Sequence, residues 1–256
     1  MVLLFDLIMI ILKLIYSLYA WLLTMTIFFA HYLLTKLIMI FPLKNKSTIF
    51  YKLANIFLKS AFFLGAIRVK VQGAKNFDSE ENYVVIANHQ SLLDVVILMA
   101  YLPQRIVFFA KKELSKVPIL SYDLKNMEHV LVDRQNKSSA LLQLEKMKDR
   151  LDKKLNAFIF PEGTRSHNGE IKPFKRGAFH LAAQAKKAVI PCYIHGSIKL
   201  LKKNQTLFLP GIIHLVIGKP INDPFTDSSK EISKRLQQKA EASVRELQNN
   251  LINNLT

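Results

Sequence analysis

The sequence predicts an α/β protein whose mainly parallel sheet is covered by helices on both faces, with an N-terminal membrane-embedded helical segment. Two observations lead to this prediction. From residue 68 onward, short apolar runs typical of buried strands alternate with longer segments of helical periodicity, which favours a parallel sheet between two helix layers. Before that point, residues 1–41 are almost uncharged and strongly apolar.

The N-terminal stretch is long and apolar enough to embed in a bilayer. Between Lys13 and Lys36 there is no acidic or basic residue other than His31, and a helix of roughly 20 apolar residues spans the hydrocarbon core. The stretch is too long for a signal peptide, and a helix apolar on every side would need an unusually large soluble core. We therefore expect a membrane anchor, either one spanning helix or a bent pair of helices in one leaflet.

Residues 42–70 join this anchor to the rest of the chain. They include Lys44, Lys46, Lys52 and Lys59, which by the positive-inside rule place the large C-terminal part in the cytoplasm. Residues 47–67 have the pattern of an amphipathic helix that could lie on anionic lipid. The chain is therefore divided into residues 1–65, the anchor and amphipathic segment, and residues 66–256, the α/β domain.

The remaining elements are predicted from their apolar periodicity. Strands are expected at residues 68–73, 83–88, 105–110, 129–134, 156–163, 188–194 and 214–221. Helices are expected at residues 91–102, 138–151, 177–187 and 228–252, and residues 111–120 are expected to form a loop or a short helix.

The chain is strongly basic and contains one cysteine. Its 36 Lys and Arg residues outnumber 19 Asp and Glu residues, and the net charge of +17 suits a polyanion such as nucleic acid, anionic lipid or an acidic carrier. No nucleic-acid-binding signature is present, so no nucleic acid partner is expected. Cys192 lies in an apolar run and is expected to be a core residue, and the sequence has no zinc-type Cys/His spacing.

The segment Asn-His-Gln-Ser-Leu-Leu-Asp, residues 88–94, allows two interpretations. Ser91 and Asp94 have the spacing of a helix capping box. His89 and Asp94 could also form the base half of a catalytic triad, in which the carboxylate orients the imidazole. The two interpretations are compatible, because a carboxylate in the first helical turn can reach the ring. No Gly-x-Ser-x-Gly elbow supplies a nucleophile, which suggests that the attacking hydroxyl belongs to the substrate.

A second segment, Ile-Phe-Pro-Glu-Gly-Thr-Arg-Ser at residues 159–166, follows a buried strand. Gly163 lets the backbone approach a ligand closely, and Arg165 offers a planar fork that matches phosphate oxygens. Lys172, Lys175 and Arg176 follow, just before a predicted helix whose N-terminus also attracts anions. The simpler alternative is a strand-to-loop turn with an exposed salt bridge.

Together these segments resemble the motifs of the glycerolipid acyltransferase family. Residues 88–94 and 160–166 occur in the family's order, and residues 110–120 and 188–194 are similar to its second and fourth blocks. The resemblance covers roughly residues 68–220 and is closest to the bacterial 1-acyl-sn-glycerol-3-phosphate acyltransferases. It implies transfer of an acyl chain from acyl carrier protein or coenzyme A to the sn-2 hydroxyl of lysophosphatidic acid, which gives phosphatidic acid.

The resemblance also implies roles for individual residues. His89 would be the general base and Asp94 its orienting partner. The residues implied to bind the acceptor are Glu162, Gly163, Thr164, Arg165, Lys111 and Arg134, and Pro191 is implied to shape the acyl-chain site. The family pattern implies no cofactor and no metal. It also implies a bacterial inner membrane, with the catalytic domain on the cytoplasmic side.

Two alternatives stay open at this point. The same chemistry could act on another lysolipid, such as a lyso-ornithine lipid, or on glycerol 3-phosphate. The chain could instead be a non-catalytic basic membrane-associated protein, although that function gives no reason for His89, Asp94 and Glu162 to gather at one side of a sheet.

Overall fold

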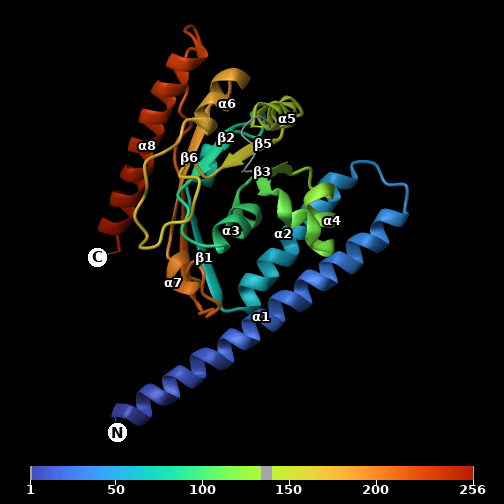
Figure 1. Cartoon of the computed structure of the whole chain (residues 1–256), viewed down its shortest axis with the longest axis vertical. Helices are drawn as coiled ribbons and strands as arrows, with labels where there is room; N and C mark the ends of the chain where they lie inside the picture. Colours follow the sequence, from blue (N-terminus) through green and yellow to red (C-terminus); the bar gives the residue numbers. More distant parts are fainter. Residues whose placement is uncertain (1, 134–139, 256) are drawn as a thin grey trace.

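The computed structural model describes residues 2–133 and 140–255, arranged around one twisted sheet (Figure 1). The strand order is β1-β7-β6-β2-β5-β3-β4. Among the described strands only β6 and β7 pair antiparallel, so the predicted mainly parallel sheet is confirmed. The strands are β1 (Ile67–Gln72), β2 (Val84–Ala87), β3 (Ile106–Lys111), β4 (Val130–Val132), β5 (Asn156–Ile159), β6 (Val189–His195) and β7 (Gly211–Ile217).

Helices cover both faces of the sheet, as predicted. They are α1 (Val2–Ile40), α2 (Lys46–Leu64), α3 (Leu93–Tyr101), α4 (Pro118–Asn126), α5 (Ala140–Asp152), α6 (Gly177–Ala185), α7 (Ser197–Leu200) and α8 (Ser229–Asn253), with two 3₁₀ turns at Ala74–Asn76 and Lys112–Lys116. In β2 all four residues are fully buried, because successive side chains enter cores on opposite faces.

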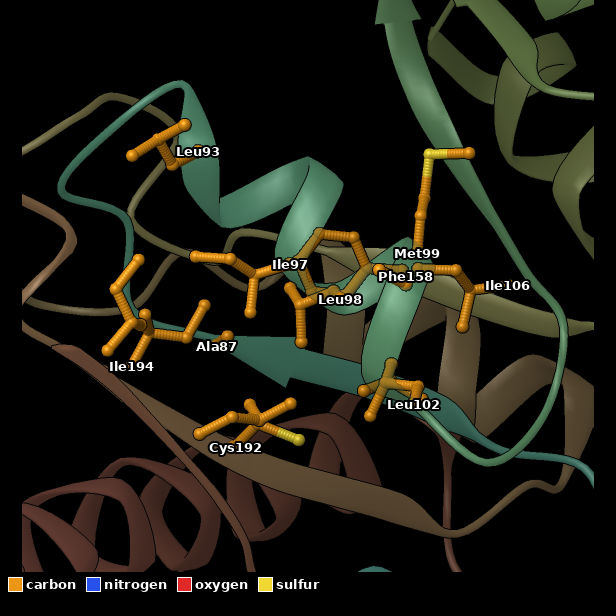
Figure 2. Close-up of a cluster of buried hydrophobic side chains, with 14 of the residues drawn as sticks. Ala87, Leu93, Ile97, Leu98, Met99, Leu102, Ile106, Phe158, Cys192 and Ile194 are labelled. Carbon is orange, nitrogen blue, oxygen red and sulfur yellow. The ribbon is translucent and has the colours of Figure 1, made fainter. Parts of the chain in front are cut away.

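The two cores are built by different helices. On one face, side chains of α3 such as Ile97 and Leu98 pack onto Ala87 and Cys192 of the central strands (Figure 2). Helices α5, α6 and α8 cover the other face. Cys192 is fully buried, as expected, and burial raises the pKa of its thiol.

Helix α1 is continuous through the apolar N-terminal stretch, without the bend that a pair of helices would need. Of the described residues, one helical segment, Leu4–Ile40, is long and apolar enough to cross a membrane. Residues 4–15 are exposed all round. Farther along, Ser17 Oγ and Trp21 Nε1 donate hydrogen bonds to the Thr206 carbonyl at 3.1 and 2.7 Å, which fixes α1 against the sheet domain.

Helix α2 is the predicted amphipathic helix, and it packs its apolar face inward. Phe50, Tyr51 and Ala54 are buried in the same core as the sheet residues, whereas Phe63 is 82% exposed. The proposed division at residue 65 stays a prediction, although β1 begins only two residues later.

The predicted loop or short helix at residues 111–120 is confirmed, because a 3₁₀ turn and the start of α4 lie there, and α4 continues to Asn126. Two other details of the element predictions are wrong. The short helix α7 was not predicted. Strand β7 begins at Gly211, before the predicted residue 214, because residues 211–213 pair with the first residues of β1.

Candidate active site

The carboxyl ends of the parallel strands gather the polar residues of the two sequence motifs. His89 follows β2 and Glu162 follows β5, and these two strands are neighbours that run in the same direction. In open α/β sheets ligands bind at this edge. The fold therefore brings residues 88–94 and 159–166 together, although about seventy residues of chain separate them.

His89 and Asp94 form a hydrogen-bonded pair. His89 Nδ1 lies 2.9 Å from Asp94 Oδ2, and the Asp94 carboxylate is fully buried while the His89 side chain is 16% exposed. With Nδ1 held by the carboxylate, the other ring nitrogen, Nε2, is the one left for a substrate. This is the arrangement of a general base and its orienting acid.

The same carboxylate also organises the start of α3. Asp94 Oδ2 accepts hydrogen bonds from the backbone N–H groups of Gln90 (2.6 Å) and Ser91 (2.8 Å). Ser91 Oγ in turn accepts from the N–H of Leu93 at 3.2 Å. The predicted capping contacts are therefore present together with the His–Asp pair, and α3 begins at Leu93, two residues after the predicted start at residue 91.

Ser91 is not placed to act as a nucleophile. Its hydroxyl is fully buried and donates a hydrogen bond to the Leu201 carbonyl at 2.7 Å. A serine nucleophile needs an exposed oxygen that hydrogen-bonds to its base. This arrangement fits a direct transfer to a substrate hydroxyl.

Phe160 is a site residue that the sequence analysis missed. Its ring stacks on the His89 ring, with centroids 3.7 Å apart and planes 11° from parallel, and meets Phe158 edge-on. The only sequence signal was an aromatic residue just before Pro161 at the end of a strand. Asp94 holds one edge of the imidazole and Phe160 covers one face, so the ring orientation is fixed.

Glu162 ties the two motifs together through the backbone. Its Oε1 accepts from the N–H of His89 at 2.8 Å and its Oε2 accepts from the N–H of Lys172 at 3.1 Å. The side chain is only 3% exposed, and burial raises its pKa above the usual value for glutamate. Both oxygens are occupied by protein groups, so Glu162 positions His89, and its contact with substrate stays a prediction.

The next residues of the motif line the same region. Gly163 has φ of +73°, a left-handed conformation that favours glycine, and a Cβ there would lie 2.9 Å from Lys175 Nζ. Thr164 is exposed and Arg165 is half-buried. The N–H of Ser166, next to Arg165, donates to the His89 carbonyl at 2.7 Å, so the backbone of this motif lies beside His89, and the binding role of Arg165 stays a prediction.

Two other predicted site residues, Lys111 and Pro191, have no hydrogen bond or ion pair to this cluster among the described contacts. Lys111 ends β3 two strands from β2, is half-exposed and pairs with Glu113 at 3.3 Å. Pro191 is buried within β6 opposite Ile86, close to Gly218. Arg134 lies outside the described residues. The roles of these three residues in binding stay predictions.

Comparison with known proteins gives a consistent result. A family model described as Acyltransferase matches residues 68–195. The chain is 36% identical over 173 residues to 1-acyl-sn-glycerol-3-phosphate acyltransferase alpha of Mus musculus, covering 67% of this chain and 61% of that protein. It is 37% identical over 139 residues to 1-acyl-sn-glycerol-3-phosphate acyltransferase of Helicobacter pylori, covering 54% and 58%. The chain thus spans less than two thirds of the length of these curated relatives.

A solved structure is similar over nearly the whole chain. The crystal structure of the 1-acyl-sn-glycerophosphate (LPA) acyltransferase PlsC from Thermotoga maritima superposes with a TM-score of 0.79 at 26% identity, covering 93% of this chain and 97% of that one. The matched family region contains both sequence motifs and the His89–Asp94 pair. The chain therefore belongs to the Acyltransferase family.

Proposed function

We propose that this protein transfers an acyl chain from an acyl thioester to the sn-2 hydroxyl of lysophosphatidic acid and so produces phosphatidic acid. The observation that carries the proposal is the His89–Asp94 pair, in which a carboxylate orients an imidazole while the neighbouring Ser91 hydroxyl is bonded to the Leu201 carbonyl and so is not available as a nucleophile. The names of the curated relatives and of the superposed structure supply the substrate class.

In the proposed reaction, His89 Nε2 accepts the proton of the acceptor hydroxyl while its oxygen attacks the thioester carbonyl carbon. The imidazolium that forms is stabilised by Asp94, whose Oδ2 lies 2.9 Å from Nδ1. When the tetrahedral intermediate collapses, the carbon–sulfur bond breaks and the imidazolium returns the proton to the departing thiolate. The products are the ester and a free thiol, and the base is regenerated.

The proposed donor is acyl carrier protein or coenzyme A carrying the acyl chain. Both donors and the acceptor are anionic, which agrees with the net charge of +17. Arg165 is proposed to bind the acceptor phosphate, because its guanidinium fork suits phosphate oxygens and its neighbour Ser166 is bonded to His89.

We place this reaction at a membrane, with the catalytic domain on the cytoplasmic side of a bacterial inner membrane. Residues 4–15 of α1 are exposed and, apart from Asp6 and Lys13, apolar, and Phe63 and Leu64 at the end of α2 add exposed apolar surface. Exposed apolar side chains on this scale are stable in lipid and unstable in water. The lysines of residues 42–59 suit anionic headgroups.

Purified protein in detergent tests the proposal with labelled lysophosphatidic acid and either acyl donor. Wild type is compared with His89→Ala, and His195→Ala serves as a matched control because it removes a histidine from the end of the neighbouring strand β6. We expect phosphatidic acid from wild type and from His195→Ala, and a loss of at least about 10²-fold in His89→Ala. Equal rates in all three would refute His89 as the base, and product only with another lysolipid or glycerol 3-phosphate would change the acceptor.

A further inference from the structure

Two lysines from distant parts of the chain meet beside the catalytic pair. Lys172 Nζ and Lys203 Nζ each donate a hydrogen bond to the carbonyl oxygen of Arg165, both at 3.2 Å. Lys172 follows the Glu162 motif, whereas Lys203 lies in the segment between α7 and β7. Since they share one oxygen, the two ammonium groups lie within about two hydrogen-bond lengths of each other.

The segments that carry both lysines are held by residues of the two sequence motifs. The Lys172 backbone is bonded to Glu162, which also holds the backbone of His89. The segment that carries Lys203 is held by Ser91, whose hydroxyl donates to the Leu201 carbonyl. The position of the cation pair is therefore determined by the same contacts that position the base.

Neither ammonium group of the pair forms an ion pair with an acid among the described residues, although Lys172 and Glu162 interact through their charges. In residues 2–133 and 140–255, no carboxylate oxygen lies within 4.0 Å of either ammonium group. The acid of the motif, Glu162, accepts hydrogen bonds from backbone N–H groups with both of its carboxylate oxygens. Lys203 Nζ also lies 2.9 Å from His167 Nε2, which serves as an acceptor when the imidazole is neutral. Two adjacent cations repel each other, and a bound anion removes that repulsion.

The free donors of the pair suit a phosphate. Each ammonium group has three N–H donors, and the described contacts use one in Lys172 and two in Lys203. Both side chains are half-buried, so a ligand can reach them while their positions stay restricted. Lysine binds phosphate as a point charge, and two such charges at one carbonyl match a phosphomonoester with two negative charges.

We propose that Lys172 and Lys203 form a phosphomonoester subsite that adds to the binding provided by Arg165. This inference rests on the proposed function, because it names how that site holds a phosphate. The phosphate belongs either to the acceptor lysolipid or, where the donor is acyl-coenzyme A, to the phosphomonoester of its coenzyme A portion. Lys203 lies outside both sequence motifs and would be a specificity-determining residue of the reaction.

Steady-state kinetics distinguish the two sources. Lys203→Met is compared with Lys203→Arg, which keeps the charge, and with Lys202→Met, an exposed lysine in the same segment. The acceptors are lysophosphatidic acid and the phosphate-free monoacylglycerol, and the donors are acyl-coenzyme A and acyl-pantetheine. We expect Lys203→Met to raise KM for the phosphate-bearing substrate about tenfold or more with little change in kcat. Loss of one hydrogen bond to a charged group weakens binding by about this factor. Lys203→Arg recovers part of the affinity.

The arms of the experiment give separate outcomes. A raised KM for lysophosphatidic acid alone assigns the subsite to the acceptor, and a raised KM for acyl-coenzyme A alone assigns it to the donor. Unchanged KM values in Lys203→Met would overturn the subsite. An equal rise in KM for the phosphate-free substrates, monoacylglycerol and acyl-pantetheine, would also overturn it and show that Lys203 only stabilises the loop. The Lys202→Met protein should match wild type throughout.

A binding measurement keeps this test separate from the proposed function. Inorganic phosphate should raise the melting temperature of wild type and Lys202→Met relative to chloride at equal ionic strength, and should raise it less in Lys203→Met, in which Lys172 and Arg165 remain. Phosphate stabilisation that is identical in all three proteins would refute the subsite. Wild type that is stabilised by phosphate but inactive with lysophosphatidic acid would refute the proposed function and leave the subsite standing.

Discussion

One carboxylate oxygen, Asp94 Oδ2, accepts hydrogen bonds from the His89 ring at 2.9 Å and from the two backbone N–H groups that lead into α3. The oxygen therefore orients the imidazole of His89, the proposed base, and fixes the helix start at the same time. Because α3 packs into the core through Ile97 and Leu98, the position of the imidazole is tied to the packing of the whole helix.

Replacing Asp94 by asparagine should reduce both activity and stability. The amide keeps the size of the side chain but lacks the charge that stabilises the imidazolium, so we expect kcat to fall by about 10²–10⁴-fold. The charge-assisted bonds to Gln90 and Ser91 also weaken, and the free energy of unfolding should fall by about 1–3 kcal/mol. Kinetics and denaturant unfolding measure the two effects. A variant with wild-type kcat would show that the carboxylate only caps the helix.

The Phe160 ring should affect the rate through the orientation of His89. In Phe160→Leu the side chain remains apolar but loses the ring that lies 3.7 Å from the imidazole. An aromatic pair contributes about 0.5–1.5 kcal/mol, so we expect kcat to fall about three- to tenfold with KM nearly unchanged. Phe160→Tyr keeps the ring and should stay close to wild type. Equal rates in the leucine and tyrosine variants would exclude the stacking as a positioning contact.

Much of the fold could be predicted because its strands are short apolar runs. β2 is buried on both faces and reads as the continuous run Val84–Ala87, and the helices between strands have clear periodicity. The antiparallel direction of β7 could not be read in the same way. An apolar run shows burial but not direction, and here the direction depends on the pairing of residues 192–195 with residues 214–217.

The site was predictable where its residues are adjacent in the sequence and not where they meet through the fold. His89 and Asp94 are five residues apart, so their contact follows from a helical turn. Lys203 approaches Arg165 from a segment whose path is set by α7 and β7. The hydrogen bonds that the Glu162 carboxylate accepts from the backbone of His89 and Lys172 were also not predicted. Every residue type except proline has a backbone N–H, so the sequence does not show which residues donate these bonds.

Asn88 should contribute strongly to stability. Its side-chain amide donates to the Ile194 carbonyl at 2.9 Å and accepts from the Ile194 N–H at 2.7 Å, which joins the ends of β2 and β6. Asn88→Ala leaves buried backbone groups unpaired, and we expect the free energy of unfolding to fall by about 2–4 kcal/mol. Asn250→Ala, at an exposed position of α8, is the control and should change stability little. Urea unfolding of both variants tests this, and equal midpoints would contradict it.

His129 should make the folded protein sensitive to acid. The residue is buried at the start of β4, its Nδ1 accepts from the N–H of Phe108 at 3.3 Å, and its Nε2 has no partner among the described residues. Burial, with a smaller contribution from the Arg105 guanidinium, lowers the pKa of His129 from 6.5 to about 3.

The sign of the pH effect follows from proton uptake. Between pH 6.5 and about pH 3 the unfolded chain binds a proton at His129 and the folded chain does not, so stability is retained above this window and falls as pH drops through it. Between pH 7 and pH 5 wild type should lose about 2 kcal/mol of unfolding free energy through this group. His129→Gln removes the titrating ring. The unfolding free energy of this variant should therefore fall by about 2 kcal/mol less than that of wild type between pH 7 and pH 5. Denaturant unfolding at several pH values gives both slopes, and parallel curves for the two proteins would show that His129 does not set the acid sensitivity.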